Sequence, residues 1–447
     1  WIGTYFGGIN FLSASLKNSD SHNIFFKNFR LEESTSNCLC NNTVMAITQT
    51  SDNYYWFGTL GGGLDRFDFS SDSFRHFVND PNDDNSLVDN DVISLYQDRS
   101  GILWIGTHVG EGISRLEMNT AKFNILRNKP GEMNSLNDNV IWAIHEDSKN
   151  NLWFGTYRGG LNYFHRSENK FSHYLFDEHN SNSLSDNHIR SLEEDDKDNL
   201  WIGTYSGGLV KFNKKTKTFT AFKNNPKDET SIGSNQVQDI FYDDNSVIWI
   251  GTFGGGLNKL VAQQGDGRSG ILFKRYTHDP NNKFSISDNR IYKIYKDRTG
   301  IFWIATFGGG LNKFDLVTEK FYHYQHDPAN KNSLSDDRVM SIYEDEAGTL
   351  WIGTFGGGLN KFDRKTGKFF NFSKDDGLNS SVVYGILEDS HSNLWMSTDD
   401  GIYKFGIRDQ LFSHYDLQDG LQSMEFSGGA YYKSKFGEMF FGGINGI

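Results

Sequence analysis

Trp-Ile-Gly-Thr occupies residues 351–354, and the chain repeats these four residues, or a close variant, along nearly its whole length. Successive copies start 44 to 55 residues apart, and a degenerate copy, Phe440-Phe441-Gly442-Gly443, begins 45 residues after the last of them. A period close to fifty residues indicates that one supersecondary unit is repeated about ten times. The copies begin at Trp1, Trp56, Trp104, Trp153, Trp201, Trp249, Trp303, Trp351 and Trp395.

Residues 285–327 show what one repeat contains. Their β-branched and aromatic residues fall into short runs that are typical of strands, and turn residues such as the three glycines 308–310 separate the runs. Four short strands without helical periodicity predict the blade of a β-propeller. The four predicted strands are 290–295, 301–306, 311–314 and 321–324.

Seven of the nine signature copies carry an aspartate six residues before the tryptophan. Three residues before the tryptophan stands Gly, Asn, Asp or Ser, the residue types that tolerate a left-handed backbone. We therefore interpret these aspartates as structural turn residues and not as catalytic groups. They are Asp98, Asp147, Asp195, Asp243, Asp297, Asp345 and Asp389.

Ten repeats exceed the roughly four to eight blades that close one ring, so the sequence predicts an all-β chain of tandem β-propellers. Counting seven signatures back from Phe440 places the start of the second ring near Asn139. We expect residues 1–135 to form the C-terminal blades of an incomplete first propeller, and residues 136–447 to form a seven-bladed second propeller with a truncated last blade. The 54-residue interval after Trp249 is explained by a loop insertion at 261–268.

Composition excludes some function classes. The net charge of −13 leaves no basic stripe for a nucleic acid. Cys38 and Cys40 are one residue apart, too close for an unstrained bridge, so we expect free thiols. The histidines recur at equivalent repeat positions, which indicates repeat structure, and we expect neither a metal nor a cofactor. Because the chain begins inside a second strand and ends where a third should begin, we expect it to be a fragment.

The stretch 339–363, with Trp-Ile-Gly-Thr-Phe-Gly-Gly-Gly-Leu-Asn-Lys-Phe-Asp at its end, closely resembles the two-component regulator propeller repeat. The C-terminal stretch 419–446 is similar to the last propeller blade of that family. The resemblance implies the periplasmic sensor region of a hybrid two-component histidine kinase, an inner-membrane protein found chiefly in Bacteroidetes. It also implies an immunoglobulin-like domain, a membrane helix and a kinase beyond this segment, and a homodimer in the intact receptor. A diguanylate cyclase is the alternative output domain.

Strand direction predicts where a ligand binds. The loop that enters the first strand and the loop between the second and third strands lie at the same ends of antiparallel strands, so they share one face of the ring. Two positions per blade point to that face: the residue after the signature Thr and the residue before the first-strand Val or Ile. The candidate ligand-binding residues are Tyr157, Arg158, His188, Tyr205, Gln236, Arg290, Phe307, Arg338 and Phe355.

Flat rings stack on sugars and arginines bind carboxylate or sulfate, so the sequence favours an oligosaccharide ligand, and an acidic one fits the arginines. Blade packing of the phenylalanines and solvated arginines at the ring mouth are the alternatives. Trp142, the one tryptophan outside the signature, either lines the central channel or packs in the core. A propeller that binds a protein partner through this face is a further alternative.

A propeller glycoside hydrolase, sialidase or polysaccharide lyase is the enzymatic alternative. Arg158, Arg290 and Arg338 on one face could imitate the arginine cluster of a sialidase. Glycosidases need two carboxyl groups at a set separation, and the predicted face offers mainly Asp399, Asp400 and Glu425, without a nucleophile or a partner of raised pKa. We therefore expect no enzymatic activity in this segment and assign no catalytic residue.

Overall fold

The computed structural model describes residues 1–13, 25–32, 37–50, 54–69, 71–81, 83, 86–98, 102–108, 112–117, 123–262 and 271–447. Within these ranges the regular structure is β-strand, apart from the single 3-10 turns η1 (Lys374–Asp376) and η2 (Leu417–Asp419). The chain is therefore all-β, as predicted. Most of the insertion expected at 261–268 lies outside the described residues. The chain divides into two compact units, Trp1–Lys122 and Phe123–Ile447.

The described residues of the first unit form three antiparallel sheets, each with its strands in sequence order. Neighbouring sheets contact one another, β1 with β4 and β4 with β8, as blades of one ring do. The first sheet comprises β1 (Ile2–Thr4), β2 (Gly8–Ser13) and β3 (Phe25–Phe29). The second comprises β4 (Val44–Gln49), β5 (Tyr55–Thr59), β6 (Gly63–Asp68) and β7 (Ser73–Phe77). The third comprises β8 (Val92–Gln97), β9 (Ile102–Thr107) and β10 (Ile113–Glu117).

The second unit contains six four-stranded sheets and one two-stranded sheet. The first sheet comprises β11 (Ile141–Glu146), β12 (Leu152–Thr156), β13 (Leu161–His165) and β14 (Lys170–Tyr174). The second comprises β15 (Ile189–Glu194), β16 (Asn199–Thr204), β17 (Leu209–Asn213) and β18 (Thr218–Phe222). The third comprises β19 (Val237–Tyr242), β20 (Ile248–Thr252), β21 (Leu257–Ala262) and β22 (Ile271–Tyr276). The others comprise β23 (Ile291–Lys296), β24 (Phe302–Thr306), β25 (Leu311–Asp315), β26 (Lys320–Tyr324); β27 (Val339–Glu344), β28 (Leu350–Thr354), β29 (Leu359–Asp363), β30 (Lys368–Phe372); β31 (Gly385–Glu388), β32 (Asn393–Ser397), β33 (Ile402–Gly406), β34 (Phe412–Tyr415); β35 (Phe426–Lys433) and β36 (Met439–Gly443).

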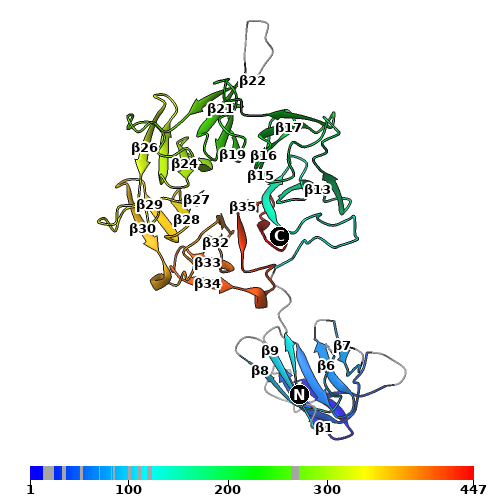
Figure 1. The fold of residues 1–447 in the computed structure, drawn as a ribbon. Helices are drawn as coiled ribbons and strands as arrows, with labels where there is room; N and C mark the ends of the chain where they lie inside the picture. Colours follow the sequence, from blue (N-terminus) through cyan, green and yellow to red (C-terminus); the bar gives the residue numbers. More distant parts are fainter. Residues whose placement is uncertain are drawn as a thin grey trace. The chain divides into compact units, whose positions relative to one another are not determined.

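These seven sheets form a closed ring. Their innermost strands contact one another in the order β11, β15, β19, β23, β27, β31 and β35, and β35 also contacts β11. Figure 1 shows the sheets arranged as blades around a common axis. The second unit is therefore a seven-bladed propeller, which confirms the predicted fold class.

Residues 123–127 belong to the last blade and not to the repeat that precedes them in sequence. The amide of Leu126 donates to the carbonyl of Ile447 (3.1 Å), and the amide of Ile447 donates back (3.0 Å). Leu311 and Tyr324 pair in the same way where the third and fourth strands of another blade meet. The boundary between the units therefore falls after Lys122, earlier than the expected division between residues 135 and 136, because this long-range pairing holds 123–127 in the second ring.

Each signature tryptophan is placed to pack between its own blade and the next. Trp351 is 1% exposed and packs against Phe405 of the following blade, with ring centroids 5.6 Å apart. Trp104, in the last described blade of the first unit, is 38% exposed because no further sheet among the described residues of that unit covers it. Packing between blades thus explains why a tryptophan recurs once per blade along the chain.

The aspartate that precedes seven of the signature tryptophans is structural, as predicted. In the blade of Trp351, Asp345 accepts the amide of Thr349 through Oδ1 (2.8 Å) and the indole Nε1–H through Oδ2 (2.8 Å). The residue that closes this turn has a left-handed backbone, as at Gly348 (φ 84°) and Asn150 (φ 67°). The other aspartates that accept from their tryptophan are Asp98, Asp147, Asp195, Asp243, Asp297 and Asp389.

Candidate ligand-binding site

The two predicted position sets meet on one face of the second ring. The amide of the residue after the signature Thr donates to the carbonyl of the residue before the first strand of the same blade, as Phe307 does to Arg290 and Phe355 to Arg338 (both 2.9 Å). This confirms that the two loops share a face. The same bond joins Tyr157 to Val140, Tyr205 to His188 and Phe253 to Gln236.

A cavity of about 360 Å³ opens at this face on the ring axis, and we call it the outer cavity. Four of the predicted residues line it: Tyr205, Gln236, Phe307 and Phe355. Tyr157 and His188 lie beside it, packed on the indole of Trp142 at centroid distances of 4.5 and 6.4 Å. Arg158 lies with its guanidinium 5.0 Å from the ring of Tyr157.

Arg290 and Arg338 each bind a neighbouring aspartate. They line neither the outer cavity nor the second cavity described below. Arg290 donates through Nη2 and Nε to both oxygens of Asp288, at 2.5 and 3.0 Å. Arg338 binds Asp336 in the same bidentate way, at 2.6 and 2.9 Å. A ligand carboxylate would have to compete with these internal partners.

Sequence reasoning missed the residues that a β-bulge turns towards the axis. In β15 the register shifts between Ile189 and Ser191, so that Arg190 is unpaired, and β23 shifts in the same way around Tyr292. A bulge leaves one residue out of the ladder and re-aims its side chain. Strict alternation gave no sign of this; only the position of Trp142, which follows Ile141 as Arg190 follows Ile189, could have indicated it. The bulge residues that line a cavity are Arg190, Gln238, Tyr292 and Met340.

A second cavity of about 140 Å³, the inner cavity, lies next to the outer one and shares these four bulge residues as a wall. It is polar. Lys293 Nζ lies 2.8 Å from Asp239 Oδ1, and the amide of Ile294 donates to the other oxygen of Asp239 (2.7 Å). Burial raises the pKa of Glu193 to about 8 and lowers that of His145 to about 4. Both groups are therefore mostly uncharged at neutral pH.

Replacing Glu193 with glutamine is expected to stabilise the protein at pH 7 and not at pH 4.5. The pKa of Glu193 is higher in the folded chain than in the unfolded chain, so its ionisation destabilises the fold as the pH rises from about 4.5 towards 8. At about 1.4 kcal/mol per pH unit, and allowing for solvation within the cavity, the gain at pH 7 is about 2–3 kcal/mol. Urea denaturation of both proteins at the two pH values measures it.

Glu168→Gln, at an exposed turn, is the matched control and should leave the free energy of unfolding unchanged at both pH values. A Glu193→Gln gain that is the same at pH 4.5 and pH 7 would contradict a buried, neutral carboxyl.

The carboxylates considered for catalysis are held by neighbouring hydroxyls. Asp399 accepts from Ser380 Oγ (2.6 Å), and Asp400 accepts from Tyr403 (2.8 Å). Glu425 lies 3.4 Å from the hydroxyl of Tyr384. The three carboxylates therefore have hydrogen-bond partners within the last two blades.

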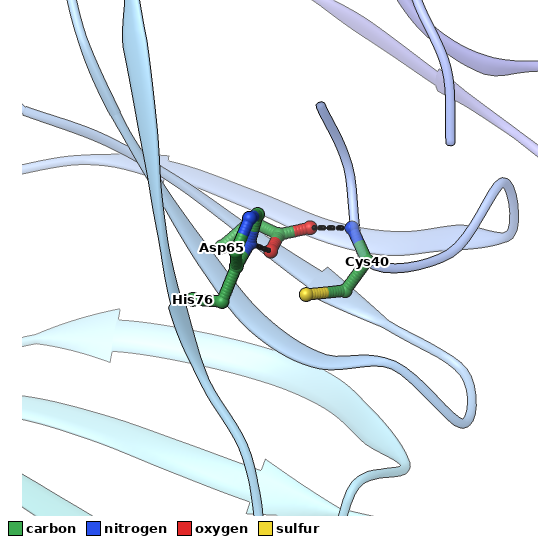
Figure 2. Close-up of side chains that lie close together, drawn as sticks. All are labelled: Cys40, Asp65 and His76. Carbon is green, nitrogen blue, oxygen red and sulfur yellow. Dashed lines mark hydrogen bonds and ion pairs between the residues drawn. The ribbon is translucent and has the colours of Figure 1, made fainter. Parts of the chain in front are cut away.

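Cys40, Asp65 and His76 form a close group in the first unit, with potential ligand atoms within 4.8 Å of one another (Figure 2). Both oxygens of Asp65 are already used: Oδ2 accepts the amide of Cys40 (2.9 Å) and Oδ1 lies 2.6 Å from His76 Nδ1. In another blade Asn312 accepts the amide of Ser287 in the same way (3.0 Å). The group is therefore a variant of a side-chain to backbone hydrogen bond that the repeat uses elsewhere. In the described residues no disulfide joins Cys38 to Cys40.

Eight segments match the family model of the two component regulator propeller. They are residues 38–61, 86–108, 135–158, 183–206, 231–254, 285–308, 333–356 and 377–400. This chain belongs to the two-component regulator propeller family. Each of the six matched segments in the second unit covers the first two strands of a blade and the loops on the face of the outer cavity.

This regulator propeller is similar to solved extracellular domains of hybrid two component systems from B. thetaiotaomicron. The BT3049 domain is 25% identical, with a TM-score of 0.63, over 99% of this chain and 59% of that one. The BT4673 domain is 21% identical, with a TM-score of 0.58, over 91% of this chain and 52% of that one, and supports the fold alone. Histidine kinase P4 of Formosa agariphila is 31% identical over 72 residues, 16% of this chain and 5% of the kinase. The chain thus spans little more than half of the two solved domains.

The described residues include no helix with the length and apolarity needed to cross a membrane.

Proposed function

We propose that this chain is the ligand-sensing, periplasmic region of a hybrid two-component sensor and that it binds an oligosaccharide. Its likeness to the BT3049 extracellular domain over 99% of its length supports the sensor role, as does its local identity with Histidine kinase P4. The intact receptor would be a homodimer anchored in the inner membrane and linked to a kinase. Ligand binding would act through a difference in affinity between two arrangements of the dimer.

The observation that carries the ligand proposal is the aromatic lining of the outer cavity. Phe253, Phe307 and Phe355 come from three consecutive blades, and their ring centroids are 6.1 and 5.8 Å apart along the row. All three are half-buried, so each ring keeps accessible surface. Apolar ring faces beside a polar group such as Gln236 suit a sugar, which has C–H faces and hydroxyl edges.

Replacing Phe307 and Phe355 together with alanine is expected to weaken oligosaccharide binding by about 1–3 kcal/mol, because two stacking faces are lost. Calorimetry of the whole chain against a panel of defined acidic and neutral oligosaccharides measures the effect. Phe370→Ala, at a 53% exposed position on the outer strand β30 of the same blade as Phe355, is the matched control and should bind like the wild type.

Binding that survives loss of both phenylalanines would remove the outer cavity as the site. The bound oligosaccharides should be recovered unchanged after incubation, because no positioned acid and base pair accompanies the aromatic rings. Release of shorter products that stops on Asp399→Asn would overturn the sensor role in favour of an enzyme.

A further inference from the structure

Arg190 is a half-buried cation for which the described residues provide no carboxylate partner. Its guanidinium carbon lies 3.6 Å from the ring centroid of Trp142 and 5.2 Å from that of Tyr205. Its Nε is buried and has no hydrogen-bond partner among the described residues. Burial lowers the pKa of Arg190, and nearby tyrosine hydroxyls oppose this shift. By contrast, Arg290 and Arg338 at the rim each bind an aspartate.

Arg190 stands where the two axial cavities meet, because it lines both. Three further buried polar atoms in the wall of the inner cavity lack partners in the described part of the chain: His145 Nε2, Ser191 Oγ and Tyr431 Oη. Buried polar atoms without partners are costly, and several of them around one cavity indicate that something polar fills it. Water alone could satisfy the hydroxyls, but it would leave the charge of Arg190 unbalanced.

The charges around the inner cavity sum to a positive value at neutral pH. Lys293 neutralises Asp239 at 2.8 Å. Glu193 is mostly protonated because it is buried. The remaining charge is that of Arg190, which lies against the π faces of Trp142 and Tyr205. A bound anion would supply the missing partner.

We propose that Arg190 binds the carboxylate of a sugar acid whose ring occupies the outer cavity, so that the receptor selects glycans ending in a uronic acid. This inference rests on the proposed function and narrows its ligand class. A planar carboxylate fits the fork of the guanidinium, and a bound carboxylate would give Arg190 an anionic partner. The aromatic residues of the outer cavity hold the sugar ring, while Arg190 distinguishes acid from neutral sugar.

The test is calorimetry of the whole chain with D-glucuronate, D-glucose and acetate as probes. D-glucuronate should bind at least tenfold more tightly than D-glucose or acetate. Arg190→Gln keeps a neutral amide donor near the position of Nε and removes the charge, and it should reduce D-glucuronate affinity at least tenfold, to the level of D-glucose. Arg190→Lys should retain part of the preference. Arg290→Gln and Arg338→Gln, the matched rim controls, should change D-glucuronate affinity less than threefold.

Equal affinity for D-glucuronate and D-glucose in the wild type would overturn the inference, as would an Arg190→Gln variant that keeps the preference. Acetate binding as tight as that of D-glucuronate would overturn the sugar acid as the ligand. A thermal melt of Arg190→Gln checks folding, and Arg190→Lys decides the case if that variant is unfolded. Oligosaccharide binding that depends on Phe307 and Phe355 but not on Arg190 would refute this inference alone. Arg190-dependent binding of D-glucuronate without binding of any oligosaccharide would refute the proposed function alone.

Discussion

Replacing Trp351 with alanine is expected to lower the free energy of unfolding of the second unit by about 3–5 kcal/mol, the usual cost of truncating a large buried aromatic residue. The side chain is 1% exposed and lies against Phe405 of the next blade and Phe372 of its own. Its removal leaves a cavity between two blades and leaves Asp345 without the indole donor. Urea denaturation followed by circular dichroism measures the loss.

Two further variants separate packing from the hydrogen bond. Trp351→Phe keeps most of the ring and loses only the indole N–H, so it should cost less than the alanine variant. Phe370→Ala, at its exposed position, should cost less than about 1 kcal/mol. If Trp351→Ala were as stable as Phe370→Ala, the interblade position of the signature tryptophan would be wrong.

Replacing Arg364 with methionine is expected to cost about 3–5 kcal/mol, because it leaves two buried carboxylates without their cation. Arg364 follows β29, and its Nη1 and Nη2 lie 2.5 Å from Asp297 and 2.7 Å from Glu344. The two carboxylates are 0% and 2% exposed. Asp297 belongs to the preceding blade, so the ion pair joins neighbouring blades.

The loss should shrink as the pH falls. Burial opposes ionisation of Asp297, but hydrogen bonds from Thr299, Trp303 and Arg364 outweigh it and lower the folded pKa of Asp297 below its ordinary value. The stability that its charge contributes is therefore present above about pH 4 and is lost below it. Without Arg364, protonation of Asp297 relieves the buried charge of that carboxylate, so urea denaturation at pH 4.5 should give a smaller difference from wild type than at pH 7.

Lys274→Met is the matched control, since Lys274 and Glu319 form an ion pair in which both side chains are nearly half exposed. Surface pairs contribute about 0–1 kcal/mol, so this variant should remain close to wild type. Arg364→Lys, which keeps one positive charge, should fall between the two. An Arg364→Met variant no less stable than Lys274→Met would show that the buried pair does not join the blades.

The repeat, the four-stranded blade and the structural aspartates could be predicted from the sequence because each depends on residues close together in the chain. Thr349 and Trp351 close the Asp345 turn within six residues. The same turn recurs once per repeat, so its spacing gives the length of one blade. The face that the two loops share was also predictable, because it follows from strand direction alone. The pairing of Arg338 with Asp336 spans two residues and could have been read from the sequence as well.

Two features were decided only by the tertiary structure. The pairing of Leu126 with Ile447 joins distant parts of the chain, and its benefit comes from closing the ring, so no local pattern marks residues 123–127 as part of the last blade. The bulge at Arg190 interrupts the two-residue alternation on which strand prediction depends, and the bulge alone turns this side chain to the axis. Each blade is specified by its own sequence, whereas the axial cavities exist only when seven blades close around them.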